Sequence, residues 1–268
     1  MPNLFAQLYT IRACDGNLTN PIPILYILLP NKTTQTYQRM FAIIYSKIPS
    51  FTSKDWPEYF ISDFEAGIIA AVKTALPNTR HLGCYFHYKS ALLKYIANNG
   101  LKPLFGYPEF ATQMRKVAAL AFVPSKEAVL RGWLHLIETS SKEIRPFLEY
   151  FEEKWLGMLK LNKRRSPAPF NLWNFGEQIR EGIPLFDNSV EIWNIKLNGF
   201  LEKHNQSLHT LLNAIDQALP GKLTKLNKSA NVRTFTQRVT SLVESFTEET
   251  SIEAYLASVA SLMFNSKK

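Results

Sequence analysis

Residues 59–87 read YFISDFEAGIIAAVKTALPNTRHLGCYFH, and they set the predicted fold class. The apolar run over 59–62 is typical of a short buried strand, and a helix is predicted directly after it over 64–76, where a proline stops it. A second strand over 81–84 and a second helix over 85–98 repeat the pattern. Strands separated by helices of this length predict a partly parallel sheet, and the loops at the carboxyl ends of its strands are the expected site of chemistry.

The residues before this stretch predict a hairpin and one more helix. Phe5–Cys14 and Ile22–Leu29 are rich in aromatic and branched side chains, and Asp-Gly-Asn at 15–17 is a tight-turn signal between them. We expect two antiparallel strands, the second buried on both faces, followed by a helix over 34–48. The predicted order over the first hundred residues is therefore β-β-α-β-α-β-α.

Strand signals fade after Gly100, and the rest of the chain is predicted to be almost entirely helical. Helical periodicity is found over 109–122, 126–139, 143–159, 188–201, 209–219, 232–246 and 252–264. The basic, proline-containing stretch 160–169 (KLNKRRSPAP) is predicted to be a mobile connection. The apolar face of 208–219 is typical of a core or an oligomer interface.

Composition limits the classes of function. The chain has 268 residues, of which 46% are apolar and 20% charged, so it is expected to fold. Lysine and arginine number 31 against 22 acidic residues, which favours a polyanionic partner such as nucleic acid, although solubility alone also explains a net charge of +9. No apolar run is long enough for a membrane helix, and the amino terminus lacks the pattern of a secretory signal. Two cysteines, Cys14 and Cys84, are too few for a disulfide scaffold and favour a reducing compartment.

Asp63 is the first candidate for a functional residue. It follows the strand over 59–62 and precedes a helix, so rigid backbone would hold its carboxylate at the open end of the sheet, as a divalent-metal ligand requires. The alternative is an ordinary helix N-cap, with Glu65 as favourable charge in the first turn. The position alone favours the N-cap.

Cys84, His87 and Glu191 are weaker candidates. Cys84 and His87 have the spacing of half a zinc site, but a structural zinc ion needs four ligands, so a buried cysteine beside a first-turn histidine is the favoured alternative and no zinc site is expected. Glu191 lies on a polar strip with Asn194 and Asn198, beside the apolar face of the helix predicted over 188–201. An acidic residue so early in a helix is also ordinary first-turn charge.

A series of short motifs runs along the chain in a fixed order. They are FAQLYTI at 5–11, LLPNKTT at 28–34 leading to Tyr37, SDFE at 62–65 followed by Ala66 and Ala70, GCYFH at 83–87, Gly100-Leu101, ALAFVP at 119–124, YFE at 150–152 with Trp155, and DNSVEIWN at 187–194. In this order they resemble the transposase domain of Mutator-like elements, the MULE transposases, over about residues 4–200.

The resemblance implies an RNase H-like α/β fold whose mixed sheet lacks its first strand, with a large all-helical insertion and a helical tail. The implied divisions are 1–100 for the α/β part, 101–186 for the insertion, 187–202 for the closing helix of the core and 203–268 for the tail.

The resemblance also implies DNA cleavage and strand transfer with two Asp and one Glu holding Mg²⁺ or Mn²⁺ ions. Asp63 matches the second Asp and Glu191 the Glu, while Cys84 and His87 match a Cys-x-x-His beside the active site. The family's first Asp, in an Asp-Gly-Thr-Phe-like segment before the strand at 5–14, has no counterpart here, and Asn194 stands where the family has His. We therefore expect a transposase-derived protein that is inactive as written.

Two other functions remain open. One is a non-catalytic, domesticated DNA-binding or regulatory protein, and the other is a decayed product without a selected role. The candidates for non-specific phosphate contacts are Lys160, Lys163, Arg164 and Arg165, with a later basic cluster of Lys222, Lys225, Lys228, Arg233 and Arg238; a solvated loop is the alternative for both. The family resemblance implies a DNA partner and a nuclear location, with cytoplasm as the alternative, no membrane, and self-association as a further expectation.

Overall fold

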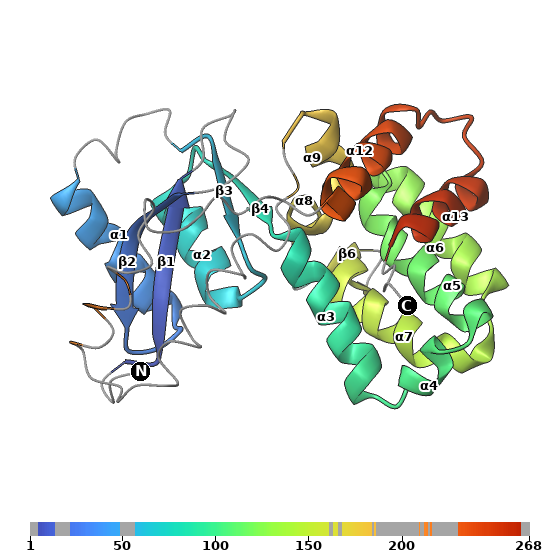
Figure 1. Cartoon of the computed structure of the whole chain (residues 1–268), viewed down its shortest axis with the longest axis horizontal. Helices are drawn as coiled ribbons and strands as arrows, with labels where there is room; N and C mark the ends of the chain where they lie inside the picture. Colours follow the sequence, from blue (N-terminus) through green and yellow to red (C-terminus); the bar gives the residue numbers. More distant parts are fainter. Residues whose placement is uncertain are drawn as a thin grey trace. The chain divides into compact units, whose positions relative to one another are not determined.

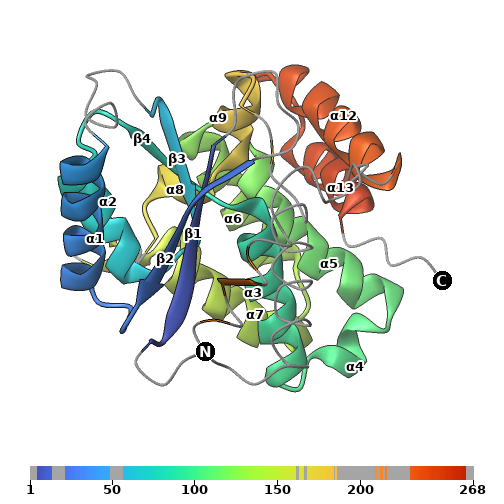
Figure 2. The same ribbon diagram turned by 60° about the vertical axis from the view of Figure 1, so that its left-hand side comes forward.

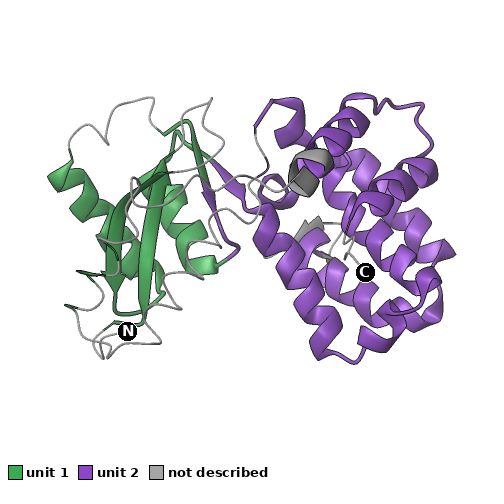
Figure 3. Cartoon of the chain, in the orientation of Figure 1, with its two compact units in different colours: residues 1–60, 65–80, 186–229 green, residues 61–64, 81–185, 230–268 purple. Residues whose placement is uncertain are grey.

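The computed structural model describes residues 5–13, 22–48, 57–160, 163–165, 168–183, 185, 209, 212–213, 215 and 230–263. The chain forms two compact units, and each contains several separate segments of the sequence (Figure 3). Unit 1 comprises 1–60, 65–80 and 186–229, and unit 2 comprises 61–64, 81–185 and 230–268. The divisions predicted at residues 100, 186 and 202 stay predictions.

Unit 1 contains a β-hairpin and two helices. Strands β1 (Gln7–Ala13) and β2 (Ile22–Leu29) pair antiparallel, with Gln7 opposite Leu29 and a register shift between Ile11 and Arg12. Helices α1 (Thr34–Lys47) and α2 (Ala66–Ala75) lie next to each other on one side of this pair (Figure 2).

The core of unit 1 follows from the alternation of side chains along the strands. It is built from Ile11, Leu29, Tyr37, Met40, Phe41, Ile44, Phe60, Ile68, Ala71, Val72 and Leu76. Successive strand residues point to opposite faces, so Ile22 and Ile24 lie away from this core and are 43% and 42% exposed. The prediction that the second strand is buried on both faces is therefore wrong.

Strands β3 (Tyr59–Ser62) and β4 (Arg80–Gly83) are joined through α2. The amide of Arg80 donates to the carbonyl of Glu58, and the amide of Cys84 donates to the carbonyl of Ser62. The residue numbers of the hydrogen-bonded positions increase in the same direction, from 58 to 62 at β3 and from 80 to 84 at β4. The two strands are therefore parallel, as the sequence predicts. In the described part of the chain the strands form three separate pairs, β1–β2, β3–β4 and β5–β6. The mixed α/β class is confirmed, while a single RNase H-like sheet stays a prediction.

Unit 2 is mainly helical (Figure 1). Its main helices are α3 (Tyr85–Asn98), α4 (Lys102–Phe105), α5 (Pro108–Ala119), α6 (Lys126–Thr139), α7 (Arg145–Phe151), α8 (Phe170–Trp173), α9 (Phe175–Arg180), α12 (Ala230–Glu244) and α13 (Ile252–Leu262). Short 3₁₀ turns, η2 (Leu120–Phe122) and η3 (Lys142–Ile144), precede α6 and α7. Trp133, Trp155 and Trp173 are at most 1% exposed in its core. Helix α13 packs on α5 and α6, and the Tyr255 hydroxyl donates to the Phe122 carbonyl, so α13 is part of this core.

The helix predicted over 143–159 is interrupted. α7 ends at Phe151, a π-helical turn, η4 (Glu152–Leu156), follows, and Gly157 has a φ of +83°. Glycine adopts this left-handed backbone without a steric penalty, so the chain can leave the helix here. It enters an antiparallel pair, β5 (Met158–Lys160) and β6 (Lys163–Arg165), and β6 lies within the stretch 160–169 predicted to be a mobile connection.

The predicted helices over 34–48, 85–98, 109–122, 126–139, 232–246 and 252–264 are confirmed to within a few residues. The helix predicted over 188–201 and most of that over 209–219 lie outside the described residues. Within the described ranges, every helix is too short or too polar to be a membrane span.

Candidate functional site

Asp63 lies directly after β3, at the carboxyl end of the parallel pair, and it is half-buried. Helix α2 begins at Ala66, and its N-cap position is Glu65. Asp63 therefore precedes the cap position by two residues, and the N-cap alternative for Asp63 is wrong. The helix starts later than predicted because Asp63 and Phe64 form an irregular link between strand and helix.

Ser62 and His81 hold the backbone of Asp63. The Ser62 hydroxyl donates to the Asp63 carbonyl at 2.8 Å, and Ser62 Oγ lies 2.8 Å from His81 Nε2. A hydroxyl carries one proton, so the imidazole must be the donor in the second bond. Burial disfavours the charged imidazole and lowers the pKa of His81 to about 4. At neutral pH a neutral His81, protonated on Nε2, thus completes a chain of two hydrogen bonds to the Asp63 carbonyl.

Phe64 fixes the next position of the chain within unit 2. Its ring packs edge-on against Trp155 with centroids 4.8 Å apart. A Cβ atom at Gly83 would lie 2.5 Å from the Phe64 ring and 2.2 Å from the carbonyl oxygen of Leu172, so only glycine fits there. The GCYFH motif therefore begins with glycine because Phe64 and Leu172 pack too closely against this position for any side chain.

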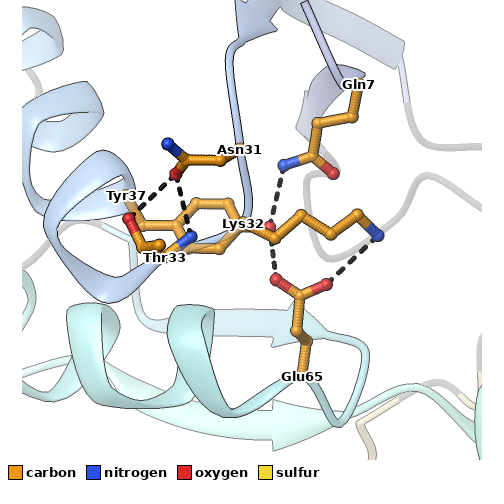
Figure 4. Close-up of polar contacts among 6 residues, drawn as sticks. All are labelled: Gln7, Asn31, Lys32, Thr33, Tyr37 and Glu65. Atoms are coloured by element: carbon orange, nitrogen blue, oxygen red, sulfur yellow. Dashed lines mark hydrogen bonds and ion pairs between the residues drawn. The ribbon is translucent and has the colours of Figure 1, made fainter.

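Glu65 is held by side chains of unit 1 (Figure 4). Its Oε1 accepts from the Tyr37 hydroxyl at 2.7 Å, and its Oε2 lies 3.2 Å from Lys32 Nζ. The Tyr37 hydroxyl in turn accepts from Gln7 Nε2 at 2.9 Å. We call Gln7, Lys32, Tyr37 and Glu65 the Glu65 network; it joins β1, α1 and the start of α2.

The loop that carries Lys32 is ordered by local caps. The Thr33 hydroxyl accepts from the amide of Thr36 and caps α1, while Asn31 Oδ1 accepts from the amide and the hydroxyl of Thr33 (Figure 4). A side-chain oxygen at this position satisfies one of the free amides of the first helical turn. The LLPNKTT motif is therefore a strand end followed by a helix cap.

Cys84 and His87 lie where β4 passes into α3. Cys84 is the N-cap residue of α3 and makes no side-chain cap hydrogen bond. His87 lies in the first turn of α3, and its ring packs edge-on against Phe86. In the described part of the chain, no three His, Cys, Asp or Glu side chains are grouped so that they could hold a metal ion.

The remaining predicted residues cannot be joined to this site. Glu191, with Asn194 and Asn198, lies outside the described residues, as do Lys222, Lys225 and Lys228. Lys160, Lys163, Arg164 and Arg165 lie on the β5–β6 hairpin, where Lys160 is directly opposite Lys163. The structure therefore brings Asp63 together with Ser62 and His81 of the same unit, and it leaves the predicted pairing of Asp63 with Glu191 untested.

Asp63 is one carboxylate of the kind that a divalent-metal site needs. Asp63 offers carboxylate oxygens, which Mg²⁺ and Mn²⁺ prefer, and its backbone carbonyl accepts a hydrogen bond from Ser62, which His81 holds in turn. A hard cation needs further oxygen ligands, and among the described residues Asp63 is the one candidate that the family resemblance assigns.

The sequence interpretation missed Tyr37 and His81. Tyr37 enters the sequence-based prediction only as the residue that follows the LLPNKTT motif, but a buried tyrosine needs a partner for its hydroxyl, and this requirement is the available signal. His81 gave no comparable signal, because its contact with Ser62 depends on the register of β3 and β4.

Residues 3–91 match the family model of the MULE transposase domain. The match covers about a third of the chain, which includes β1 to β4, Asp63 and the Glu65 network, and it agrees there with the predicted resemblance. Neither the search of curated proteins nor that of solved structures gave a match.

Proposed function

We propose, from the match of residues 3–91 to the MULE transposase domain, that this transposase-derived protein acts on DNA and that Asp63 supplies one carboxylate of a divalent-metal site. The observation that carries the proposal is the place of Asp63 at the carboxyl end of a parallel strand, in a segment held by Ser62, Phe64 and Glu65. Glu191, on the helix predicted over 188–201, is the proposed second carboxylate.

The site would serve cleavage and rejoining of phosphodiester bonds, and since the family's first Asp has no counterpart in this sequence, we propose that metal binding is kept while the reaction itself is incomplete. Bound divalent ions would activate the attacking oxygen and stabilise the leaving one. The contribution of this chain is placement of the main chain: the Ser62 hydroxyl, which accepts from His81, donates to the Asp63 carbonyl and so holds the backbone that carries the carboxylate. DNA as partner, a nuclear location and self-association are parts of the same proposal.

Mn²⁺ titration of the full chain, followed by electron paramagnetic resonance, tests the role of Asp63. Asp63→Asn should remove binding at the site because the neutral amide is a poor ligand for a hard cation. The matched control is Glu58→Gln, which neutralises an exposed carboxylate at the opposite end of the same strand and should bind Mn²⁺ as wild type does. Equal Mn²⁺ binding by wild type and Asp63→Asn would refute the role of Asp63.

A second candidate, DNA binding without catalysis, is favoured by the β5–β6 hairpin. Its register places Lys160 directly opposite Lys163, and Arg164 and Arg165 follow on the same strand. Four basic residues on one short hairpin favour an anionic partner. DNA phosphates are such a partner, and contacts with them need no base sequence.

The salt dependence of DNA binding tests this candidate. Replacing Lys160, Lys163, Arg164 and Arg165 with glutamine should make the plot of log K against log salt shallower by roughly 3 to 4, since each phosphate contact contributes about 0.9. The control replaces four exposed basic residues elsewhere in unit 2 with glutamine: Lys94, Lys102, Arg131 and Lys142. If both quadruple variants change the slope equally, the hairpin has no particular role.

A further inference from the structure

Glu65 occupies a cap position but does not act as a cap. An N-cap side chain usually accepts a hydrogen bond from an amide of the first helical turn. The Glu65 side chain makes no such bond; its two oxygens instead contact Tyr37 and Lys32, one each. Its carboxylate therefore ties the start of α2 to α1 and to the loop before α1.

Tyr37 makes this tie rigid. Its side chain is 1% exposed, and its ring packs edge-on against Tyr9 with centroids 5.5 Å apart. Its hydroxyl accepts from Gln7 and donates to Glu65, so both its proton and its position are fixed (Figure 4). A buried phenol with two hydrogen bonds gives the Glu65 carboxylate a partner whose position is fixed.

The backbone at this point is packed just as closely. A Cβ atom at Gly67 would lie 2.5 Å from the carbonyl oxygen of Lys32 and 3.2 Å from the Tyr37 ring. The first turn of α2 thus contacts the loop before α1 without space for a methyl group. Side chain and backbone together fix where α2 begins.

We infer that Tyr37 and Glu65 are positioning residues for Asp63. They fix the entry of the chain into α2, two residues after Asp63, while Ser62 and His81 fix the strand before it. The two motifs LLPNKTT…Tyr37 and SDFE, distant in the sequence, meet in this network. The inference rests on the proposed function, because it assigns the network a purpose only if Asp63 binds a metal ion.

A second tyrosine on α1 offers a matched control. The Tyr45 hydroxyl donates to the carbonyl oxygen of Ala75, at the last residue of α2. Tyr37→Phe and Tyr45→Phe each delete one hydroxyl from the same helix, and each breaks a contact with α2. The two contacts are at opposite ends of α2. Only the partner of Tyr37, Glu65, is close to Asp63 in the sequence.

Residue-resolved hydrogen exchange on the full chain is the first measurement. The Ile69 amide donates to the backbone carbonyl of Glu65 and reports on the start of α2. The Leu76 amide donates to the backbone carbonyl of Val72 and reports on the end of α2. Tyr37→Phe should speed exchange at Ile69 roughly tenfold, because a hydrogen bond to a carboxylate is lost, and should leave Leu76 unchanged. Tyr45→Phe should show the reverse pattern.

Mn²⁺ affinity of the same variants is the second measurement. Tyr37→Phe and Glu65→Ala should weaken binding roughly tenfold, as loss of a group that orients a metal ligand does. Glu65→Gln keeps an oxygen for the Tyr37 hydroxyl and loses only a pairing with an exposed lysine, so it should bind nearly as wild type does. Tyr45→Phe should bind as wild type.

The outcomes separate this inference from the proposed function. Unchanged exchange at Ile69 in Tyr37→Phe would overturn the inference, and so would faster exchange with unchanged Mn²⁺ affinity, since the network would then serve stability alone. Equal Mn²⁺ binding by wild type and Asp63→Asn would instead overturn the proposed function, whatever Tyr37→Phe does.

Discussion

His81 makes the stability of the fold depend on pH. Burial lowers its pKa from 6.5 to about 4, so the folded protein keeps a neutral imidazole where the unfolded chain already takes up a proton. The stabilisation is complete above about pH 6.5 and is lost as the pH falls towards 4. When the pH is lowered from 7.5 to 4.5, the free energy of unfolding should fall by roughly 2 to 3 kcal/mol because of His81.

Urea denaturation of wild type and His81→Gln at the two pH values measures this cost. Glutamine can still donate to Ser62 but does not titrate, so the difference between the two proteins at pH 7.5 should shrink or reverse at pH 4.5. His135→Gln, at a half-exposed position on α6, is the control and should follow wild type. A His81→Gln protein with the wild-type pH dependence would show that His81 is not the group responsible.

At the level of elements, the contact between α1 and α2 depends on the absence of a side chain at Gly67. Alanine is favoured over glycine in a helix by about 1 kcal/mol, so propensity alone predicts that Gly67→Ala stabilises α2. A Cβ atom 2.5 Å from the Lys32 carbonyl must displace backbone, and such overpacking costs roughly 1 to 3 kcal/mol. We therefore expect little gain or a net loss in thermal stability.

The propensity contribution can be measured in the same helix. Ala70 is exposed on α2, and Ala70→Gly should lower the free energy of unfolding by about 1 kcal/mol. If Gly67→Ala raises the free energy of unfolding by the same amount, the close approach of the Lys32 loop is not a constraint.

The order of the first seven elements could be predicted from the sequence because each has its own apolar period and a clear stop. The run 59–62 and the helix before Pro77 are examples, and the structure places both within two residues of the prediction. The end of α7 could not be predicted in the same way. The apolar period continues beyond Phe151, and the positive φ of Gly157, a property of the folded backbone, decides where the chain turns.

The candidate site was predictable only in part, for a similar reason. Asp63 follows a strand in the sequence, and its position is as expected. Its supports, His81 through Ser62 and Tyr37 through Glu65, come from elements that only tertiary packing brings into contact. The sequence pattern also predicted the start of this helix two residues too early. The Glu65 side chain bonds to Tyr37 of α1 and makes no cap hydrogen bond to α2.

At the scale of the whole molecule, the two units are built from interleaved segments. Asp63 lies in the four-residue segment 61–64 of unit 2, and the residues before and after it belong to unit 1. The net charge of +9, which the composition alone left open, agrees with a protein that acts on DNA. The family match covers residues 3–91, so the central claim depends on what Asp63 binds.

Crystals of the full chain grown with MnCl₂ and a short DNA duplex test that claim most directly, through the anomalous signal of manganese. The account predicts a peak at roughly 2.0 to 2.6 Å from a carboxylate oxygen of Asp63, and its loss in Asp63→Asn. Manganese peaks away from Asp63, or an unchanged peak in Asp63→Asn, would contradict it.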